Sequence, residues 1–153
     1  MTVAETRDIE LLTQLNREVQ ELHVSLHPDL FRPFDRETVS RFFESVMAKD
    51  TWHHWVAYDG NLAVGFVQVE TRRLANHPFR RDCTILYLHQ ICVKTTHRTR
   101  GVARVLLNCV RSHAKEKGIV RIELDVWLKN EPAIRSFDRL GFRTFKQQMV
   151  LEA

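Results

Sequence analysis

Apolar residues recur with a helical period in the first third of the chain and predict two amphipathic helices there. A short strand is expected at 3–6. Asp8 then caps a first helix that His27-Pro28-Asp29 ends, and Asp35, after Pro33, caps a second one. The predicted inner faces consist of Ile9, Leu12, Leu15, Val19 and Leu22 in the first helix and of Val39, Phe42, Phe43, Val46 and Met47 in the second.

The middle of the chain has the composition of strands. Segments 52–58 and 62–70 flank Asp59-Gly60-Asn61, which is a hairpin signal. A polar loop is expected at 72–83. The segment 84–93 is apolar and rich in β-branched residues, so it predicts a mostly buried strand.

The last third returns to helical periods. A helix is predicted from Val102, with Gly118 as its stop, followed by a strand at 120–126, a helix that Gly141 ends and last strands around 143–151. The order β-α-α-β-β-β-α-β-α-β predicts an α/β (α+β) fold with a mixed sheet and helices on both faces. At 153 residues, we expect a single domain over 1–153.

A basic loop with one glycine, Arg98-Thr99-Arg100-Gly101-Val102-Ala103, joins the strand at 84–93 to the following helix. The first N–H groups of a helix lack intrahelical partners, and the helix dipole adds positive potential there. Gly101 and Ala103 allow a phosphate to approach the backbone, and Arg98, Arg100 and Arg104 add charge. The junction therefore predicts a diphosphate site.

A second motif lies downstream, in Asn130-Glu131-Pro132-Ala133-Ile134-Arg135-Ser136-Phe137-Asp138-Arg139-Leu140-Gly141-Phe142. Asn130 or Glu131 is a predicted helix cap, and Ile134, Phe137 and Leu140 form the expected buried stripe. The two motifs, in this order, resemble the cofactor motifs of the GCN5-related N-acetyltransferase (GNAT) superfamily. The resemblance is strongest over 84–142.

The resemblance implies acetyl-CoA as the donor substrate and no metal. It implies that the fourth and fifth strands splay to admit the thioester arm of the donor, which the main chain of Ile91, Cys92 and Val93 contacts. The residues that the resemblance assigns to the donor are Ile91, Cys92, Val93, Arg98, Thr99, Arg100, Gly101, Val102, Ala103, Arg104, Asn130, Ala133 and Phe137.

His89 is the candidate general base, because the ordinary pKa of histidine suits proton transfer at neutral pH. In strict alternation it shares a strand face with Tyr87, Ile91 and Val93, and Tyr87 is a weaker candidate. The alternative reading of His89 is a hydrogen-bonded core residue.

Phe137 stands where many members of the superfamily carry a tyrosine that protonates the leaving thiolate. Phenylalanine has no proton to give. The sequence therefore leaves two functions open: an N-acetyltransferase acting on a primary amine of a small molecule or peptide, and a weak or inactive module that binds or senses CoA.

The resemblance implies an acceptor pocket walled by the first two helices and the loop at 72–83. Its expected wall residues are His23, His27, Phe31, Phe34 and Trp127, while Arg72, Arg73, Arg80 and Arg81 admit an anionic acceptor. The net charge of +4 is explained in part by an anionic donor, so nucleic acid is a minor alternative. Cys92 and Cys109 lie on apolar faces and are expected to be reduced core thiols. We expect a cytoplasmic protein without a membrane span. The sequence leaves open whether it is a monomer or a homodimer.

Overall fold

The computed structural model describes residues 1–152. The elements in this range are β1 (Thr2–Glu5), α1 (Ile9–Leu26), α2 (Arg36–Met47), β2 (Trp52–Asp59), β3 (Leu62–Leu74), β4 (Cys83–Val93), the 3-10 turn η1 (Thr95–His97), α3 (Val102–Glu116), β5 (Ile122–Glu123) and α4 (Glu131–Arg139).

Three helices begin at the predicted caps. The Asp8 carboxylate accepts a bond from the Leu11 N–H at 2.9 Å, and the Asp35 carboxylate accepts one from the Thr38 N–H at 2.8 Å. The Asn130 side-chain oxygen accepts from the Ala133 N–H at 3.3 Å. Each bond satisfies an N–H that the first turn of a helix leaves without an intrahelical acceptor.

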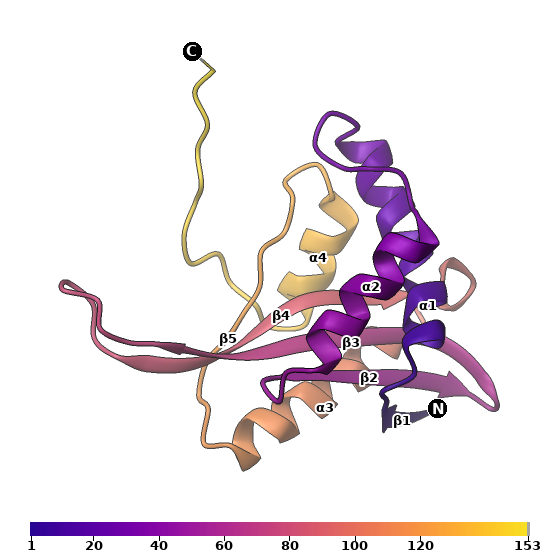
Figure 1. Ribbon diagram of the computed structural model, residues 1–153, viewed down its shortest axis with the longest axis horizontal. Coiled ribbons are helices and arrows are strands. Elements are labelled where there is room, and N and C mark those ends of the chain that lie inside the picture. The colour runs from indigo at the N-terminus through magenta and orange to yellow at the C-terminus, as the bar shows by residue number, and fades with distance from the viewer. Residues whose placement is uncertain (153) are drawn as a thin grey trace.

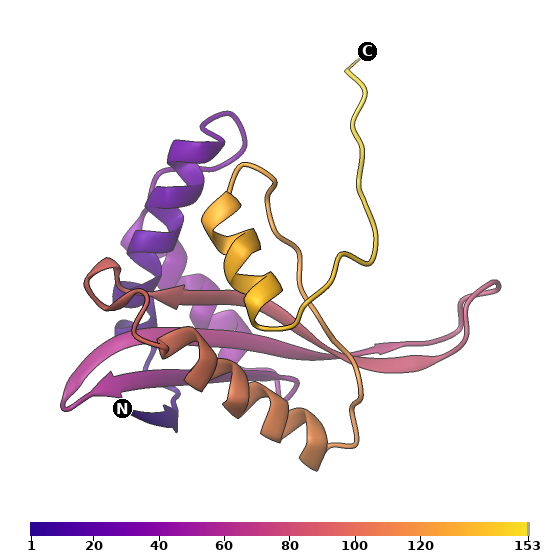
Figure 2. The same ribbon diagram turned by 180° about the vertical axis from the view of Figure 1, so that it is seen from behind.

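The strands form one mixed sheet in the order β1-β2-β3-β4-β5, antiparallel except between β4 and β5. Helices α1 and α2 cover one face, while α3 and α4 lie on the other, as the two opposite views show (Figures 1 and 2). The predicted mixed sheet with helices on both faces is confirmed.

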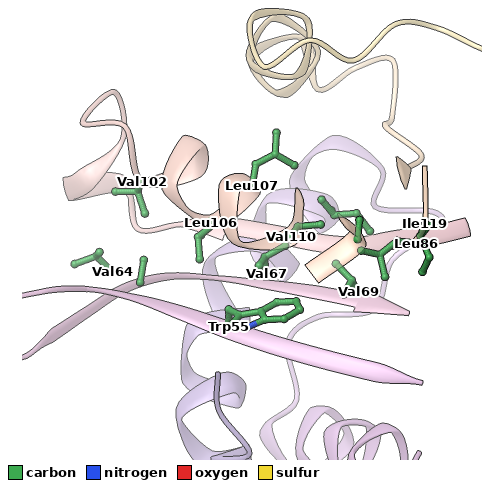
Figure 3. Packing of buried hydrophobic residues seen from close by; sticks show 13 residues of the cluster. Trp55, Val64, Val67, Val69, Leu86, Val102, Leu106, Leu107, Val110 and Ile119 are labelled. Atoms are coloured by element: carbon green, nitrogen blue, oxygen red, sulfur yellow. The ribbon is translucent and has the colours of Figure 1, made fainter. Parts of the chain in front are cut away.

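Two hydrophobic clusters hold the helices on the sheet. On one face, Leu106 and Val110 of α3 pack toward the sheet residues Val67 and Leu86 (Figure 3). On the other face, α1 and α2 bury Leu12 and Phe43 against Val56, Phe66 and Cys92. The free thiol of Cys92 is buried, as expected, and burial raises its pKa to about 11.

The long hairpin of β3 and β4 extends beyond its apolar part. The predicted loop at 72–83 is wrong at both ends, because β3 runs to Leu74 and β4 begins at Cys83. Backbone pairing continues through Arg72↔Ile85 and Arg73↔Thr84. A ladder between two strands needs no apolar side chains, so the polarity of this segment gave no signal of it.

The C-terminal part departs most from expectation. Of the strand predicted at 120–126 only Ile122 and Glu123 pair, and the last strands predicted around 143–151 are absent. Residues 143–152, here called the C-terminal arm, run exposed and without secondary structure (Figures 1 and 2). A strand requires a partner for its backbone groups, and no described segment of the same chain pairs with the arm.

Helix α4 corrects a further expectation. It contains no buried residue, so the stripe of Ile134, Phe137 and Leu140 is not the buried one that was predicted. Leu140 alone of the three packs against the core cluster beside α3. The helix follows a segment that leaves the sheet after two residues, so it has little sheet surface to cover.

Candidate functional site

The junction between β4 and α3 presents free backbone donors. Gly101 is the N-cap of α3, with φ of +82°, and no side chain caps the helix. The first helical bond runs from the Val105 N–H to the Gly101 carbonyl at 3.1 Å, so the N–H groups of residues 102–104 lack an intrahelical acceptor. A Cβ added at Gly101 would meet nothing within 4 Å. The predicted anion site therefore has both donors and open space.

Helix α1 holds the loop from outside. The carboxylate of Glu18 accepts bonds from the Thr95 N–H at 2.9 Å and from the Thr95 hydroxyl at 2.7 Å. Burial alone would raise the pKa of Glu18, but the bonds from Thr95 bring it below its usual value. This contact was not predicted, because the two residues are 77 positions apart in the chain.

Gly65 allows α3 to begin close to the sheet. A Cβ at this position would lie 2.5 Å from the Cys92 carbonyl oxygen and 3.3 Å from Cγ1 of Val102. Any larger residue would push apart the end of β4 and the first turn of α3. Gly65 was not predicted as a site residue, since its role depends on the packing of three separate elements.

Strands β4 and β5 separate after two residue pairs. They pair only at Leu86↔Ile122 and Tyr87↔Glu123, so residues 88–93 have no strand on the edge of β4 that faces away from β3. The backbone of Ile91, Cys92 and Val93 lies in this unpaired half. Unpaired N–H groups at a strand edge are available to polarise a carbonyl.

A β-bulge changes which side chains share a face of β4. Gln68 pairs with Gln90 and Val69 pairs with Leu88, so His89 is the extra residue. Ile91 and Val93 pack into the core beside α3, whereas His89 contacts residues on the opposite face. The expectation that His89 shares a face with Ile91 and Val93 is therefore wrong. Strict alternation fails at the bulge.

His89 lies at the centre of a polar network. Its Nε2 is 2.8 Å from the Glu70 carboxylate and 3.3 Å from Nη2 of Arg72, and its ring stacks on Trp52 at 4.1 Å. Nε2 cannot donate to Glu70 and accept from Arg72 at once. The shorter contact favours Nε2–H donating to Glu70, which leaves the lone pair on Nδ1.

The network sets the protonation of its members. Burial lowers the pKa of His89, and the nearby Arg72 cation lowers it further, against the opposing effect of Glu70. For Glu70 itself, burial acts to raise the pKa, but the bonds from Arg72 and His89 outweigh it, and the pKa falls. At neutral pH the pair is therefore a neutral imidazole beside a carboxylate.

Tyr87 contributes a hydroxyl whose proton is already engaged. It donates to the Asp125 carboxylate at 2.5 Å, and the Arg72 guanidinium lies 3.7 Å from its ring centroid. Burial and then the bond to Asp125 raise the pKa of Tyr87 to about 12. Such a phenol is a weak candidate for a base at neutral pH.

Aromatic and histidine side chains meet where the end of α1 approaches the segment before α4. Phe31 stacks on His23 at 4.8 Å and meets Trp127 edge-on at 5.3 Å, while His27 lies 4.8 Å from Trp127. Four of the five expected wall residues thus gather. Phe34 does not join them, because its ring lies beneath Arg17.

Phe137 and Asn130 occupy α4. The Phe137 ring makes an edge contact with Phe142 at 5.7 Å, and Asn130 uses its side-chain oxygen for the helix cap. The side-chain nitrogen of Asn130 takes no part in this helix cap, so its N–H groups are donors at the start of α4.

Comparison with known proteins agrees with the two motifs. Residues 18–142 match the model of the Acetyltransferase (GNAT) family. The chain belongs to this family. Among described residues, the protein shows neither a helix long and apolar enough to cross a membrane nor a cluster of three or more potential metal ligands.

Relatives share the fold at low identity. A tetramutant of a Bacillus halodurans protein is 28% identical with a TM-score of 0.90, covering 100% of both chains. An uncharacterized N-acetyltransferase of Methanocaldococcus jannaschii is 28% identical over 125 residues, which are 78% of this chain and 54% of that protein. The chain thus spans about half the length of that curated relative. An aminoglycoside N-acetyltransferase solved with CoA is 18% identical, with a TM-score of 0.73 and 99% and 93% coverage of the two chains.

Proposed function

We propose that this GNAT protein is an acetyl-CoA-dependent N-acetyltransferase that moves the acetyl group directly to a primary amine of a small molecule. The observation that carries the proposal is the uncapped N-terminus of α3 at the end of a strand whose outer half is unpaired. Family membership supports the same conclusion.

The donor's diphosphate fits the loop at the start of α3. The N–H groups of Val102, Ala103 and Arg104 point out of the helix end, and the dipole favours an anion there. Arg98, Thr99 and Arg100 belong to the same loop and precede the N-cap Gly101. Donation from backbone groups needs no side-chain rearrangement, so this part of the site is formed before the donor arrives.

The thioester arm is proposed to lie along the unpaired half of β4. Main-chain groups of Ile91, Cys92 and Val93 contact it, because the Cys92 side chain turns to the core beside α1 and the other two pack beside α3. Asn130 and Ala133 at the start of α4 and Phe137 one turn later form the opposite side. The Asn130 amide N–H donates to a carbonyl of the arm.

Acetyl transfer then requires one proton acceptor. The amine nitrogen attacks the thioester carbonyl carbon, the C–S bond breaks, and the sulfur leaves as a thiolate. The proton that the amine loses passes to Nδ1 of His89, directly or through one water. Glu70 holds the ring through Nε2 and stabilises the imidazolium that forms. The thiolate takes a proton from solvent.

Carboxylates beside His89 and Tyr87, and aromatic rings between the end of α1 and the segment before α4, favour a cationic amine as the acceptor. Glu70 and Asp125 supply negative charge, and Phe31 and Trp127 supply ring faces that suit a cation. The neighbour of the same fold that was solved with CoA is named as an aminoglycoside N-acetyltransferase, so aminoglycosides are among the acceptors to test. A peptide N-terminus is the second acceptor class to include.

The test is a thiol-release assay with acetyl-CoA and a panel of aminoglycosides, small polyamines and peptides with free N-termini. Turnover with at least one amine, and formation of its N-acetyl product by mass spectrometry, are expected. Hydrolysis of acetyl-CoA at the same rate with and without every amine would contradict the proposal.

Phe137 favours a second function, that of a module that binds CoA without turnover. The phenyl ring packs on Phe142 and offers no proton to a thiolate. Calorimetry with CoA and the thiol-release assay together separate the two functions. Both would bind CoA, but the binding module would release no thiol with any amine.

A further inference from the structure

Gln90 follows the candidate base on β4 and lies on the same face of the sheet. In an unbroken strand, consecutive side chains point to opposite faces. The bulge at His89 removes this alternation. The His89 side chain contacts Trp52 and Glu70. The Gln90 side chain contacts Asn16 of α1, a helix that packs on the same face as Trp52. Two neighbouring polar side chains therefore lie side by side on one face.

A buried asparagine orients the Gln90 amide. Nδ2 of Asn16 donates to Oε1 of Gln90 at 2.9 Å, and Asn16 is only 4% exposed. Burying a polar side chain costs free energy unless it is hydrogen-bonded, so this bond is favoured over other arrangements of the two amides. It fixes the oxygen of the Gln90 amide toward α1 and leaves the nitrogen of that amide out of the contact.

The nitrogen of the Gln90 amide remains a donor, because an amide nitrogen carries two N–H groups. Gln68 lies opposite Gln90 on β3, and its side-chain oxygen is buried without a partner in residues 1–152. That oxygen can take one of the two N–H groups at most. The other remains for a bound molecule. Gln90 is half-buried and lies in the half of β4 that has no strand on its outer edge.

Helix α1 holds this half of β4 at more than one point. Besides the bond from Asn16, the carbonyl of Leu15 accepts a bond from the buried Cys92 thiol at 3.6 Å. The Gln90 amide is thus held in one orientation before a substrate binds. A group that is already ordered loses little conformational freedom on binding, so its hydrogen bond contributes more to affinity.

We propose that Gln90 determines acceptor specificity by donating to an oxygen on the carbon next to the one that carries the amine. The inference rests on the proposed N-acetyltransferase function, in which the amine approaches His89. Because His89 and Gln90 are consecutive and share a face, a molecule that meets both must carry its amine and its oxygen close together. The α-amino carbonyl of a peptide N-terminus and the 2-amino alcohol of an amino sugar both do so. Asn16 is a positioning residue, since it acts only through Gln90.

Two primary amines of similar size test Gln90. Ethanolamine carries the oxygen, and propylamine has a methyl group in its place. Gln90→Leu should lower kcat/KM for ethanolamine about tenfold, as expected for one lost hydrogen bond to a substrate, and leave propylamine within about twofold. Comparing each amine between the two proteins cancels the different basicities of the amines. Gln14→Leu, on the exposed side of α1, is the matched control and should change neither value.

Gln90→Glu is the second variant, which keeps the test decisive if the leucine variant does not fold. Glutamate has the same shape and can still accept the bond from Asn16, but its carboxylate has no N–H to donate. It should therefore remove the preference for ethanolamine over propylamine. A preference that survives both Gln90 variants overturns the proposal.

Glycinamide distinguishes the two sources of the oxygen, because it presents a carbonyl where ethanolamine presents a hydroxyl. A larger loss with glycinamide in Gln90→Leu assigns the site to peptide N-termini, and a larger loss with ethanolamine assigns it to amino alcohols. An equal loss with both admits both sources. Each of these results supports recognition of the neighbouring oxygen. An equal loss with propylamine as well overturns it.

Asn16→Leu tests the positioning role. The change should lower kcat/KM for ethanolamine about three- to tenfold, because the Gln90 amide is then free to turn, and leave propylamine and CoA affinity unchanged. In the Gln90→Leu background it should have no further effect. A purely structural role of Asn16 would lower the rates with both amines alike and would add to the effect of Gln90→Leu. Circular dichroism melting checks that each variant folds.

Failure of this inference differs from failure of the proposed function. A wild type that prefers propylamine, or that acetylates larger amines but neither oxygen-bearing probe, overturns the role of Gln90 and leaves the N-acetyltransferase standing. A wild type that releases no thiol with any amine overturns both.

Discussion

The candidate site at β4 has two parts, one made of backbone groups and the other of side chains. At its C-terminal end, the loop to α3 offers backbone N–H groups that are fixed by the helix and by the left-handed Gly101. At the bulge, Glu70, Arg72 and His89 form a half-buried network of side chains from two strands. One part is a fixed dipole, and the other is a set of groups that gain and lose protons.

This difference decides how each part responds to change. A backbone site tolerates replacement of the side chains around it, and its affinity for an anion varies little with the titration of neighbours. Replacing a single side chain of the network removes a hydrogen bond or a proton acceptor. The rate that depends on the network therefore changes with pH. Binding of the donor and transfer of its acetyl group should therefore be separable by single substitutions.

Gly101→Glu should produce the largest effect, a loss of CoA affinity on the order of 10³-fold or more, through lost charge-assisted bonds and added repulsion. Calorimetry with CoA measures it. The left-handed conformation should also cost about 1 kcal/mol of stability.

Gly118→Glu is the matched control for Gly101→Glu. Gly118 follows the other end of α3, with φ of +66° and nothing within 4 Å of an added Cβ. This variant carries the same strain and charge but should bind CoA normally. Equal affinity of the two variants would show that the diphosphate lies elsewhere.

His89→Ala should lower kcat about 10²-fold or more while CoA affinity stays nearly unchanged, because general-base catalysis contributes about that much. Steady-state kinetics with the best acceptor and calorimetry check the two halves of this statement. His113→Ala replaces a half-buried histidine of α3 whose pKa burial also lowers, and it should keep full activity. Loss of folding in place of turnover would return His89 to the role of a core residue.

The sequence predicted the backbone part of the site far better than the network. Gly101, the helix caps and the order of elements depend on neighbours a few positions away, which a single sequence displays. The face of His89 depends on a bulge in its pairing with β3, and its partner Glu70 lies 19 positions away. The arm shows a related limit: its alternation is that of a strand, but no described segment of the chain pairs with it.

Glu70→Gln tests the network through its pH dependence. The carboxylate raises the pKa of His89, so its removal should lower that pKa further. The base form then persists to lower pH, and the acidic limb of the kcat profile should move to lower pH. The rate at pH 8 should fall about tenfold or less, since the imidazole remains but its cation loses support. An acidic limb that stays in place or moves to higher pH would separate Glu70 from the reacting histidine.

Phe137→Tyr should have the smallest effect and bears on both parts at once. The ring lies on α4, half-buried against Phe142, so a hydroxyl can be added without filling a closed core. We expect normal folding and unchanged CoA affinity. We also expect a change of kcat within about threefold, confined to the alkaline limb, because a thiolate leaves readily without an acid. Alanine at the same position is the control, since it removes the ring without adding a donor. A wild type that is inert with every amine, beside a tyrosine variant that turns over, would make the natural protein a CoA-binding module.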